Sequence, residues 1–377
     1  MAIWGILKER YETKRPRKLL ALDGGGIRGV ITLEILAKLE SELRAKSGRG
    51  EYFRLSDYFD YIAGTSTGAI IAAGLSIGMS VNELLEFYIN RGKDMFDKSF
   101  ILKRWKSLYE SGPLLNMLKE TFGADTDLVI SKGKYKCLLM VVTMNRTTDS
   151  PWPISNNPLA KYNNIGRPDN NAMIRLYQLV RASTAAPVYF PPETLQWDPN
   201  DPNKTFVFVD GGVTPYNNPS FLLYRMATHP AYHLNWEKGE DKLMVVSVGT
   251  GAAPSEGEYR NLLDTATGIP NNLMYAMQID QDINCRTIGR CTYGEEIDRE
   301  MGTMISDQPL TVNTGKDFLY VRYNANLTRK GLDDLGLKNL DPEDVIKMDS
   351  VKYIDKLQKV GKAAAKQVSL DHFGNFI

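Results

Sequence analysis

Short apolar runs alternate with stretches of helical periodicity at the start of the chain. The run Leu19–Leu22 stops at three consecutive glycines, and leucines then recur at helical spacing over Leu33–Leu43. A second apolar run at 58–64 is followed by the helical stretch Gly68–Ile77. Strand, loop and helix repeated in this order are typical of a parallel sheet covered by helices. We therefore expect an α/β fold with a central, mostly parallel sheet flanked by helices.

Three later apolar runs predict further strands. Residues 137–145 are continuously apolar and rich in branched side chains, as strands buried on both faces tend to be, and similar runs follow at 206–210 and 243–249. Each of these two runs ends in a glycine-containing turn, so we expect both at the carboxyl edge, where open α/β sheets place their sites. Helical periodicity over Ala172–Ala182 ends at the proline-rich stretch 185–192.

The connections and the second half of the chain give weaker patterns. The stretch 145–171 is rich in Asn and Pro and too long for a plain connection, which predicts a lid or a rim over a site. Beyond Gly251 we expect a helix near 271–283, a strand at 318–323 and helical residues over 343–367. The predicted parts of the chain are an N-terminal arm (1–17), a main domain (18–252) and a C-terminal extension packed on the same domain (253–377).

One uncharged stretch, 61–82, is long enough to cross a bilayer. The sequence GTSTG inside it argues against a membrane span, because clustered glycine and hydroxyl residues mark a turn between two shorter elements. We expect a buried strand, a tight turn and a buried helix here.

Composition limits the classes of protein. Hydrophobic residues make up 43% and charged residues 24% of the chain, as in soluble globular proteins. The 46 basic and 45 acidic residues give a net charge of +1, so no global charge favours a nucleic acid polymer as partner.

The cysteines and the N-terminus indicate a cytoplasmic protein. Cys137, Cys285 and Cys291 lack the paired spacing of a zinc site or a secreted disulfide framework. Residues 1–18 lack the apolar core and cleavage site of a signal peptide. Trp4, Ile6 and Leu7 precede several basic residues there, so the arm could lie on a membrane surface, but we expect a solvated arm.

The turn GTSTG at 64–68 matches G-x-S-x-G, the nucleophile elbow, in which a serine sits at a sharp strand-to-helix turn. Gly64 and Gly68 would be required where strand and helix come together. The predicted strand before Ser66 and helix after it supply the context that the motif needs. The alternative is a structural turn that contains a serine by chance.

A serine nucleophile needs a base. The chain has only three histidines, none of them at the end of a strong strand: His229, His233 and His372. Asp210 is better placed, because it closes a predicted strand and is followed by Gly211 and Gly212. A carboxylate of ordinary pKa, about 3.9, is a weak base, so a Ser–Asp pair would need a buried or well-oriented aspartate. The alternative role for Asp210 is to cap the turn.

The glycines after the first strand offer a site for negative charge. Consecutive N–H groups of Gly24–Gly26 at a helix N-terminus form a concave donor surface, and Arg28 adds a positive charge nearby. With Gly29 the loop also satisfies the dinucleotide fingerprint G-x-G-x-x-G. That fingerprint expects an acidic residue at the end of the next strand, whereas Glu51 has the distance but not the context, and no P-loop lysine follows. An oxyanion site therefore fits better than a phosphate site.

Six motifs in order resemble the patatin-like phospholipase family: DGGGIRG (23–29), GTSTG (64–68), RASTAAPVYFPP (181–192), DGG (210–212), NNP (217–219) and SVGTG (247–251). The resemblance covers about 18–252, which would then be the catalytic domain, and the tail from 318 is similar too, but less specifically. It implies a modified α/β-hydrolase that cleaves acyl esters of phospholipids, lysophospholipids or galactolipids without a metal or other cofactor. Ser66 would be the nucleophile, Asp210 its dyad partner, and Gly24–Gly26 with Arg28 the oxyanion loop.

Other residues of these motifs are expected to shape the site. The motif glycines are Gly29, Gly64, Gly68, Gly211 and Gly212. We expect 181–192 to be a structural wall, because nothing in its chemistry requires a catalytic role.

Two surfaces for partners follow from the resemblance and from composition. Residues 95–109 mix aromatic and basic side chains suited to a lipid interface, so we expect a cytoplasmic protein in peripheral contact with membranes. An ordinary amphipathic helix packed on the sheet is the alternative. Some bacterial members with this architecture resemble effectors of antiphage signalling that are switched on by cyclic oligonucleotides, which would imply a role in antiviral defence. Residues 255–305 could form such a regulatory surface, with Arg286 and Arg290 as phosphate partners.

Two other functions compete with a serine acyl hydrolase. An acyltransferase would use the same acyl-serine and pass the acyl group to an alcohol or thiol. A non-catalytic lipid- or nucleotide-binding protein could keep the glycine loop, although the intact Ser66 and Asp210 speak against it. The oligomeric state is left open by the sequence.

Overall fold

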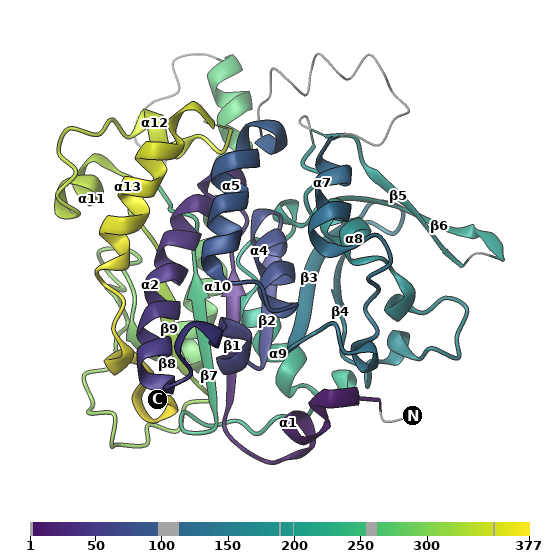
Figure 1. The fold of residues 1–377 in the computed structure, drawn as a ribbon. Coiled ribbons are helices and arrows are strands. Elements are labelled where there is room, and N and C mark those ends of the chain that lie inside the picture. The colour runs from purple at the N-terminus through teal and green to yellow at the C-terminus, as the bar shows by residue number, and fades with distance from the viewer. Residues whose placement is uncertain (1–2, 97–112, 188–189, 199, 254–261, 350) are drawn as a thin grey trace.

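A mixed β-sheet forms the centre of the molecule (Figure 1). The computed structural model describes residues 3–96, 113–187, 190–198, 200–253, 262–349 and 351–377. Within these ranges the sheet has nine strands in the order β5-β6-β3-β2-β1-β7-β9-β8, with β4 paired to β3. The strands are β1 (Arg17–Leu22), β2 (Tyr61–Thr65), β3 (Leu138–Asn145), β4 (Ser150–Ser155), β5 (Glu193–Asp198), β6 (Asp201–Asp210), β7 (Leu243–Val248), β8 (Arg290–Tyr293) and β9 (Leu319–Tyr323).

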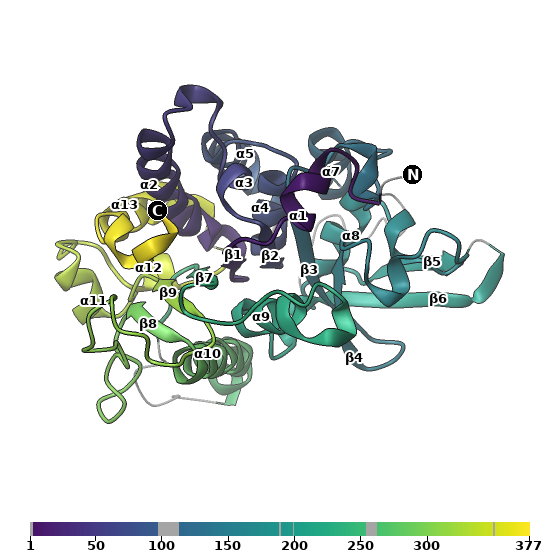
Figure 2. The same ribbon diagram turned by 90° about the horizontal axis from the view of Figure 1, so that it is seen from below.

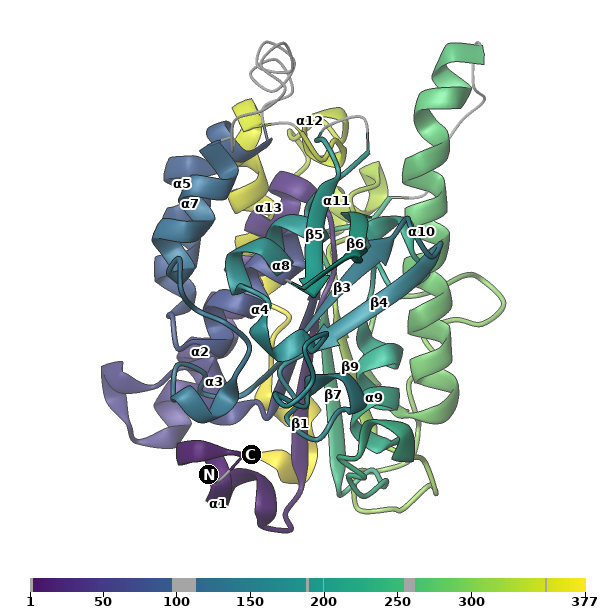
Figure 3. The same cartoon turned by 90° about the vertical axis from the view of Figure 1, so that its right-hand side faces the viewer.

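Helices cover both faces of the sheet (Figure 2). One face carries α2 (Gly29–Ser47), α4 (Thr67–Ser76), α5 (Val81–Phe96), α7 (Pro113–Phe122), α8 (Leu176–Ser183) and α13 (Ile354–Ala365). The other face carries α9 (Ser220–Thr228) and the long α10 (Leu262–Ile288), which Figure 3 shows on the opposite side of the sheet from α5 and α7. Shorter helices are α1 (Lys8–Glu12), α3 (Leu55–Tyr58), α11 (Arg329–Asp334) and α12 (Glu343–Ile346).

The predicted parallel core is confirmed. β1 pairs in parallel with β2 and β7, β2 with β3, and β7 with β9, which in turn pairs in parallel with β8. These strands read as continuous apolar runs because helices cover them on both sides, and the side chains of Leu19–Leu22 have no exposed surface. The uncharged stretch 61–82 divides into β2 and α4 as expected. No described helix is both long enough and apolar enough to cross a membrane.

The run 206–210 differs from the other predicted strands in direction. It belongs to β6, which pairs with β3 in antiparallel fashion, and β6 also forms a hairpin with β5. Because β6 approaches from beyond the carboxyl end of β3, its own last residue still reaches the carboxyl edge of the sheet. Strand direction depends on the partner strand, which an apolar run does not reveal.

The stretch 145–171 is not a loop throughout, because part of it forms a strand. Its first part turns back as β4, which pairs antiparallel with β3 from Asn145↔Ser150 to Met140↔Ser155. The remainder is held by buried asparagines, including Asn163, whose side-chain amide donates to the carbonyl of Ser155 at 2.6 Å. The prediction of a long loop was therefore wrong for 150–155.

Part of the N-terminal arm packs on the fold, which corrects our expectation of a solvated arm, although Ile6 is 70% exposed. Trp4 is 4% exposed and stacks on Tyr11 with ring centroids 4.7 Å apart. The hydroxyl of Tyr11 donates to the carbonyl of Asp60 at 2.8 Å, just before β2. Apolar residues in a basic segment here serve packing against the amino edge of the sheet.

The C-terminal extension completes the sheet and covers one helix. β9 and β8 continue the sheet beyond β7, and α13 packs on α2. Leu357 and Val360 of α13 are fully buried and belong to the same hydrophobic core as β1 and β2.

Candidate active site

Ser66 stands at a sharp turn between β2 and α4. Its backbone has φ 53° and ψ −121°, a conformation that costs energy for a residue with a side chain. The turn is tight enough that a Cβ at Gly64 would overlap the carbonyl group of Gly68. The predicted strand, turn and helix are therefore present, with the partly exposed serine at the apex.

The register of three neighbouring strands brings Ser66 and Asp210 together. In the pairing of β2 with β3, Thr65 lies opposite Val142. In the pairing of β3 with β6, the next residue of β3, Thr143, lies opposite Asp210. Ser66 follows Thr65 directly, so both side chains reach the same level at the carboxyl edge of the sheet.

The two side chains form a hydrogen-bonded pair. The Ser66 hydroxyl donates to Asp210 Oδ2 at 2.6 Å, and the Gly212 N–H donates to Asp210 Oδ1 at 2.6 Å. Asp210 is 5% exposed, and this burial raises the pKa of its carboxyl to about 6, although the hydrogen bonds from Ser66 and Gly212 act in the opposite direction. A carboxylate with a raised pKa is a stronger base than an ordinary aspartate.

The histidines have other surroundings. His229 Nδ1 accepts from the Ala231 N–H at 3.2 Å, and His372 shares a 2.8 Å hydrogen bond with the Tyr323 hydroxyl. His233 follows a short helical turn in a left-handed conformation. In the described part of the chain, none of these three residues forms a hydrogen bond with the Ser66–Asp210 pair.

Ser183 supports the turn at Ser66, and the sequence did not single it out. The Ser66 N–H donates to Ser183 Oγ at 2.9 Å, and the Ser183 hydroxyl donates onward to the carbonyl of Val142 at 2.7 Å. Within the segment 181–192, which we expected to be a structural wall, Ser183 therefore also fixes the backbone of Ser66. The only signal in the sequence was a small polar residue at the end of a predicted helix.

The glycine loop lies against Ser66. A Cβ at Gly24 would be 3.2 Å from the Cβ of Ser66. The Gly24 N–H is already used, because it donates to the carbonyl of Asn217 at 3.0 Å. Within the described residues the N–H groups of Gly25 and Gly26 have no such acceptor, so these two remain as donors of the three glycines predicted.

Arg28 points into the protein. Its guanidinium donates to the carbonyl of Ile346 at 3.0 Å, and the residue is 8% exposed. Burial lowers the pKa of Arg28 to about 10, while the nearby Asp23 acts in the opposite direction. The described contact ties the glycine loop to the C-terminal extension through α12.

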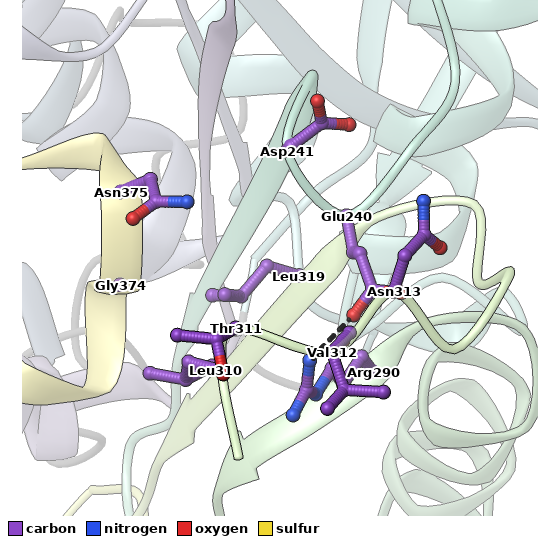
Figure 4. Close-up of a pocket in the computed structure, with 10 residues that line it drawn as sticks. All are labelled: Glu240, Asp241, Arg290, Leu310, Thr311, Val312, Asn313, Leu319, Gly374 and Asn375. Atoms are coloured by element: carbon purple, nitrogen blue, oxygen red, sulfur yellow. Dashed lines mark hydrogen bonds and ion pairs between the residues drawn. The ribbon is translucent and has the colours of Figure 1, made fainter. Parts of the chain in front are cut away.

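Arg286 and Arg290 are not available as phosphate partners, which corrects the role predicted for these two residues; residues 255–261 of the predicted surface lie outside the described residues. The Arg286 guanidinium pairs with Asp282 at 2.7 Å, and that of Arg290 pairs with Glu240 at 2.8 Å (Figure 4). Both arginines also donate to backbone carbonyls and are at most 3% exposed. Their charges are therefore satisfied inside the fold.

Two further predictions concern the lipid-facing segment and metal binding. Residues 97–109, the greater part of the predicted lipid-facing segment 95–109, lie outside the described residues. Among the residues that are described, no three His, Cys, Asp or Glu side chains gather in a way that could hold a metal ion.

Comparisons with known proteins place the chain in a family. The model described as "Patatin-like phospholipase" matches residues 20–224, more than half of the chain. A cGAMP-activated phospholipase of Vibrio cholerae is 31% identical over 227 residues, which cover 57% of this chain and 58% of that relative. Patatin group J-1 of Solanum tuberosum is 29% identical over 279 residues, which cover 69% of this chain and 67% of that relative.

Among solved structures, VipD from Legionella pneumophila is similar over 92% of this chain and 67% of that chain, with 13% identity and a TM-score of 0.38. The match to the Vibrio cholerae relative covers 58% of that protein, so the chain aligns with less than two thirds of its length. The extent of the family match and the mostly parallel sheet confirm the fold expected from the resemblance. The chain belongs to the patatin-like phospholipase family.

Proposed function

We propose that the protein is a serine acyl hydrolase that cleaves fatty-acyl esters of membrane glycerolipids through a Ser66–Asp210 dyad. The observation that carries this proposal is the 2.6 Å hydrogen bond from the Ser66 hydroxyl to a buried aspartate at a strained strand-to-helix turn. A serine so placed is exposed to an incoming ester and paired with a base. Membership of the patatin-like phospholipase family supports an acyl ester as substrate.

Acylation would use the dyad and the glycine loop together. Asp210 accepts the hydroxyl proton while Ser66 Oγ attacks the ester carbonyl carbon. The carbonyl oxygen becomes an oxyanion, which the N–H groups of Gly25 and Gly26 stabilise by donating hydrogen bonds. The C–O bond of the ester then breaks, and the proton on Asp210 passes to the departing lysolipid or alcohol oxygen.

Deacylation would repeat the same chemistry with water. Asp210, again ionised, accepts a proton from a water molecule that attacks the acyl-serine carbonyl. The same loop holds the second oxyanion, and collapse of the intermediate breaks the bond to Ser66 Oγ. The proton on Asp210 returns to Ser66, and a fatty acid leaves.

A vesicle assay tests the dyad and separates it from a triad. We expect Ser66→Ala and Asp210→Asn to abolish release of fatty acid from phosphatidylcholine, phosphatidylglycerol or galactolipid vesicles. The triple variant His229→Ala, His233→Ala, His372→Ala serves as the control and should keep its activity. Loss of activity in the triple variant with a normal melting temperature, or full activity in Asp210→Asn, would contradict the dyad.

The same assay separates hydrolysis from acyl transfer. A hydrolase releases free fatty acid whether or not an acceptor is added, because water completes the second step. An acyltransferase would instead form a new ester or thioester when an alcohol or thiol acceptor is supplied, with little free acid. Analysis of the products with and without glycerol or a thiol therefore decides between them.

A cyclic dinucleotide activator is a second proposal, supported by the relative named as a cGAMP-activated phospholipase at 31% identity. The structure offers no role for Arg286 or Arg290 in it, because both are buried in internal ion pairs. We expect addition of cGAMP to raise the rate of lipid hydrolysis. A flat response to cGAMP and to a panel of cyclic di- and trinucleotides would remove this proposal.

A further inference from the structure

An arginine of the C-terminal extension reaches the first residue of the glycine loop. Arg322, in β9, donates from both terminal nitrogens to the two carboxylate oxygens of Asp23, at 2.8 and 2.5 Å. Asp23 has no exposed surface and Arg322 is 3% exposed. Two parallel charge-assisted hydrogen bonds of this kind fix the orientation of a carboxylate as well as its position.

The strand order and register of the sheet allow this contact. β7 lies between β1 and β9, and Ser247 of β7 is the residue that pairs with Arg322. The short Ser247 side chain leaves room for the arginine to cross the strand, and its hydroxyl oxygen accepts a hydrogen bond from Arg322 Nη1 at 2.6 Å. A longer side chain at 247 would occupy the path from β9 to Asp23.

Anchoring of Asp23 determines where the following amides lie. The Asp23 N–H donates to the carbonyl of Val248 at 3.1 Å, which continues the hydrogen bonding of the sheet. The next residue, Gly24, is held on both sides, by the carbonyl of Asn217 and by the hydroxyl of Thr250, which donates to the Gly24 carbonyl at 3.0 Å. The amides of Gly25 and Gly26 therefore extend from a fixed base.

We propose that Arg322 is a positioning residue that holds the oxyanion loop through Asp23. The proposal rests on the hydrolase function proposed above and adds to it a dependence on the C-terminal extension. Arg322 lies well beyond residue 224, where the family match ends, and is 299 positions from its partner. It has no described hydrogen bond to Ser66 or Asp210, so its effect on turnover passes through the loop.

Steady-state kinetics of three variants test this role: Arg322→Lys, Arg322→Gln, and Arg322→Gln combined with Asp23→Asn. The double variant leaves no uncompensated buried charge, so it remains informative if Arg322→Gln does not fold. We expect kcat to fall by about 10²-fold in the Gln variants, the usual scale for a lost oxyanion donor, with KM changed by less than about threefold. Lysine keeps the charge but not the paired hydrogen bonds, so it should restore activity only in part.

A buried ion pair at the opposite edge of the sheet provides the matched control. Arg290 and Glu240 pair at 2.8 Å with side chains only 2% and 7% exposed, beside the amino ends of β7 and β9 (Figure 4). Arg290→Gln combined with Glu240→Gln should lower the melting temperature about as much as the Arg322 double variant. Its kcat should stay within about threefold of the wild type, since this pair is remote from the loop.

The outcomes separate this inference from the function on which it rests. If a folded Arg322 variant keeps kcat within about threefold of wild type, or the Arg290 control loses as much kcat, Arg322 is merely structural and the inference is overturned. If Ser66→Ala retains the hydrolytic activity of the wild type, the proposed function itself fails and this inference fails with it.

Discussion

At the scale of single residues, the proposed base Asp210 carries the first prediction. Its burial raises the pKa to about 6, and a base can accept the Ser66 proton only in its ionised form. We therefore expect kcat/KM to rise with pH, with a midpoint near 6, and to level off above it. A pH–rate profile on vesicles of constant composition measures this. A midpoint near 4, or a rate that falls between pH 6 and 8, would contradict the assignment of Asp210 as the base.

The same burial predicts an effect on stability. The pKa of Asp210, about 6 in the folded protein, exceeds the ordinary value of about 3.9, so its contribution to stability is present below the lower value and lost as pH rises through the higher one. An asparagine has no charge to bury and can donate to Ser66 and accept from Gly212. We expect Asp210→Asn to raise the free energy of unfolding at pH 8 by on the order of 2 kcal/mol, and far less at pH 4.

Thermal unfolding of both proteins at the two pH values checks this. A lower melting temperature for Asp210→Asn than for the wild type at pH 8 would show that ionised Asp210 stabilises the fold.

Residues of the site differ in how visible they are in the sequence. Ser66 and Asp210 stand out because Ser66 follows a predicted strand within a turn flanked by glycines, and Asp210 ends a predicted strand and is followed by glycines. Ser183 and Arg322 act through partners far away in the chain, and no local pattern shows which residues will meet. The one available signal for Arg322 was a charged residue within an apolar run.

At the scale of elements, the glycine loop carries a prediction of its own. Gly26 has φ 60°, and a Cβ there would overlap the carbonyl of Met348. A Cβ at Gly25 would overlap the side chain of Thr250. Alanine at either position must therefore displace the two amides, and we expect turnover to fall by about 10²-fold or more while binding to lipid vesicles changes little.

Gly48 offers a matched control for Gly26. It ends α2 with φ 67° and has open space where a Cβ would lie, so Gly48→Ala introduces similar backbone strain without disturbing the loop. We expect this variant to lose stability but to keep its turnover. Kinetics and vesicle co-sedimentation of all three variants make the comparison, and equal losses of turnover in Gly26→Ala and Gly48→Ala would contradict an oxyanion role.

Elements were predictable where local pattern decides them. β1, β2, β3 and β7 are buried on both faces and appear as plain apolar runs. The direction of β6 depends on its pairing with β3, which an apolar run does not reveal. β4, β5 and β8 are short and contain polar or proline residues, so no continuous apolar run marks them in the sequence. The N-terminal arm was misjudged for a similar reason, because Trp4 and Tyr11 find their apolar partners only in the folded protein.

At the scale of the whole molecule, the C-terminal extension is needed to complete the core. β9 covers the edge of β7, and Leu357 and Val360 cover α2 from α13. We expect a chain truncated after residue 252 to expose this apolar surface and to lose cooperative thermal unfolding. Circular dichroism and calorimetry test this, and a fragment that unfolds cooperatively and hydrolyses lipid would contradict it.

The six motifs that carry the resemblance lie within 18–252, and the tail from 318 resembles the family less specifically. These motifs are local turns and loops around the site, which the fold keeps at fixed positions. The extension contributes by surface contact, by two strands and by the arginine at 322, none of which a motif describes.

The central claim is that Ser66, paired with Asp210, is the nucleophile. Treatment with methyl arachidonyl fluorophosphonate followed by peptide mapping tests it most directly, because the reagent traps an activated serine as a covalent adduct. The account predicts a single adduct on Ser66 that forms quickly in the wild type and in the triple histidine variant, and at a much lower rate in Asp210→Asn. An adduct on another residue, or no adduct in an enzyme that hydrolyses lipid, would contradict it.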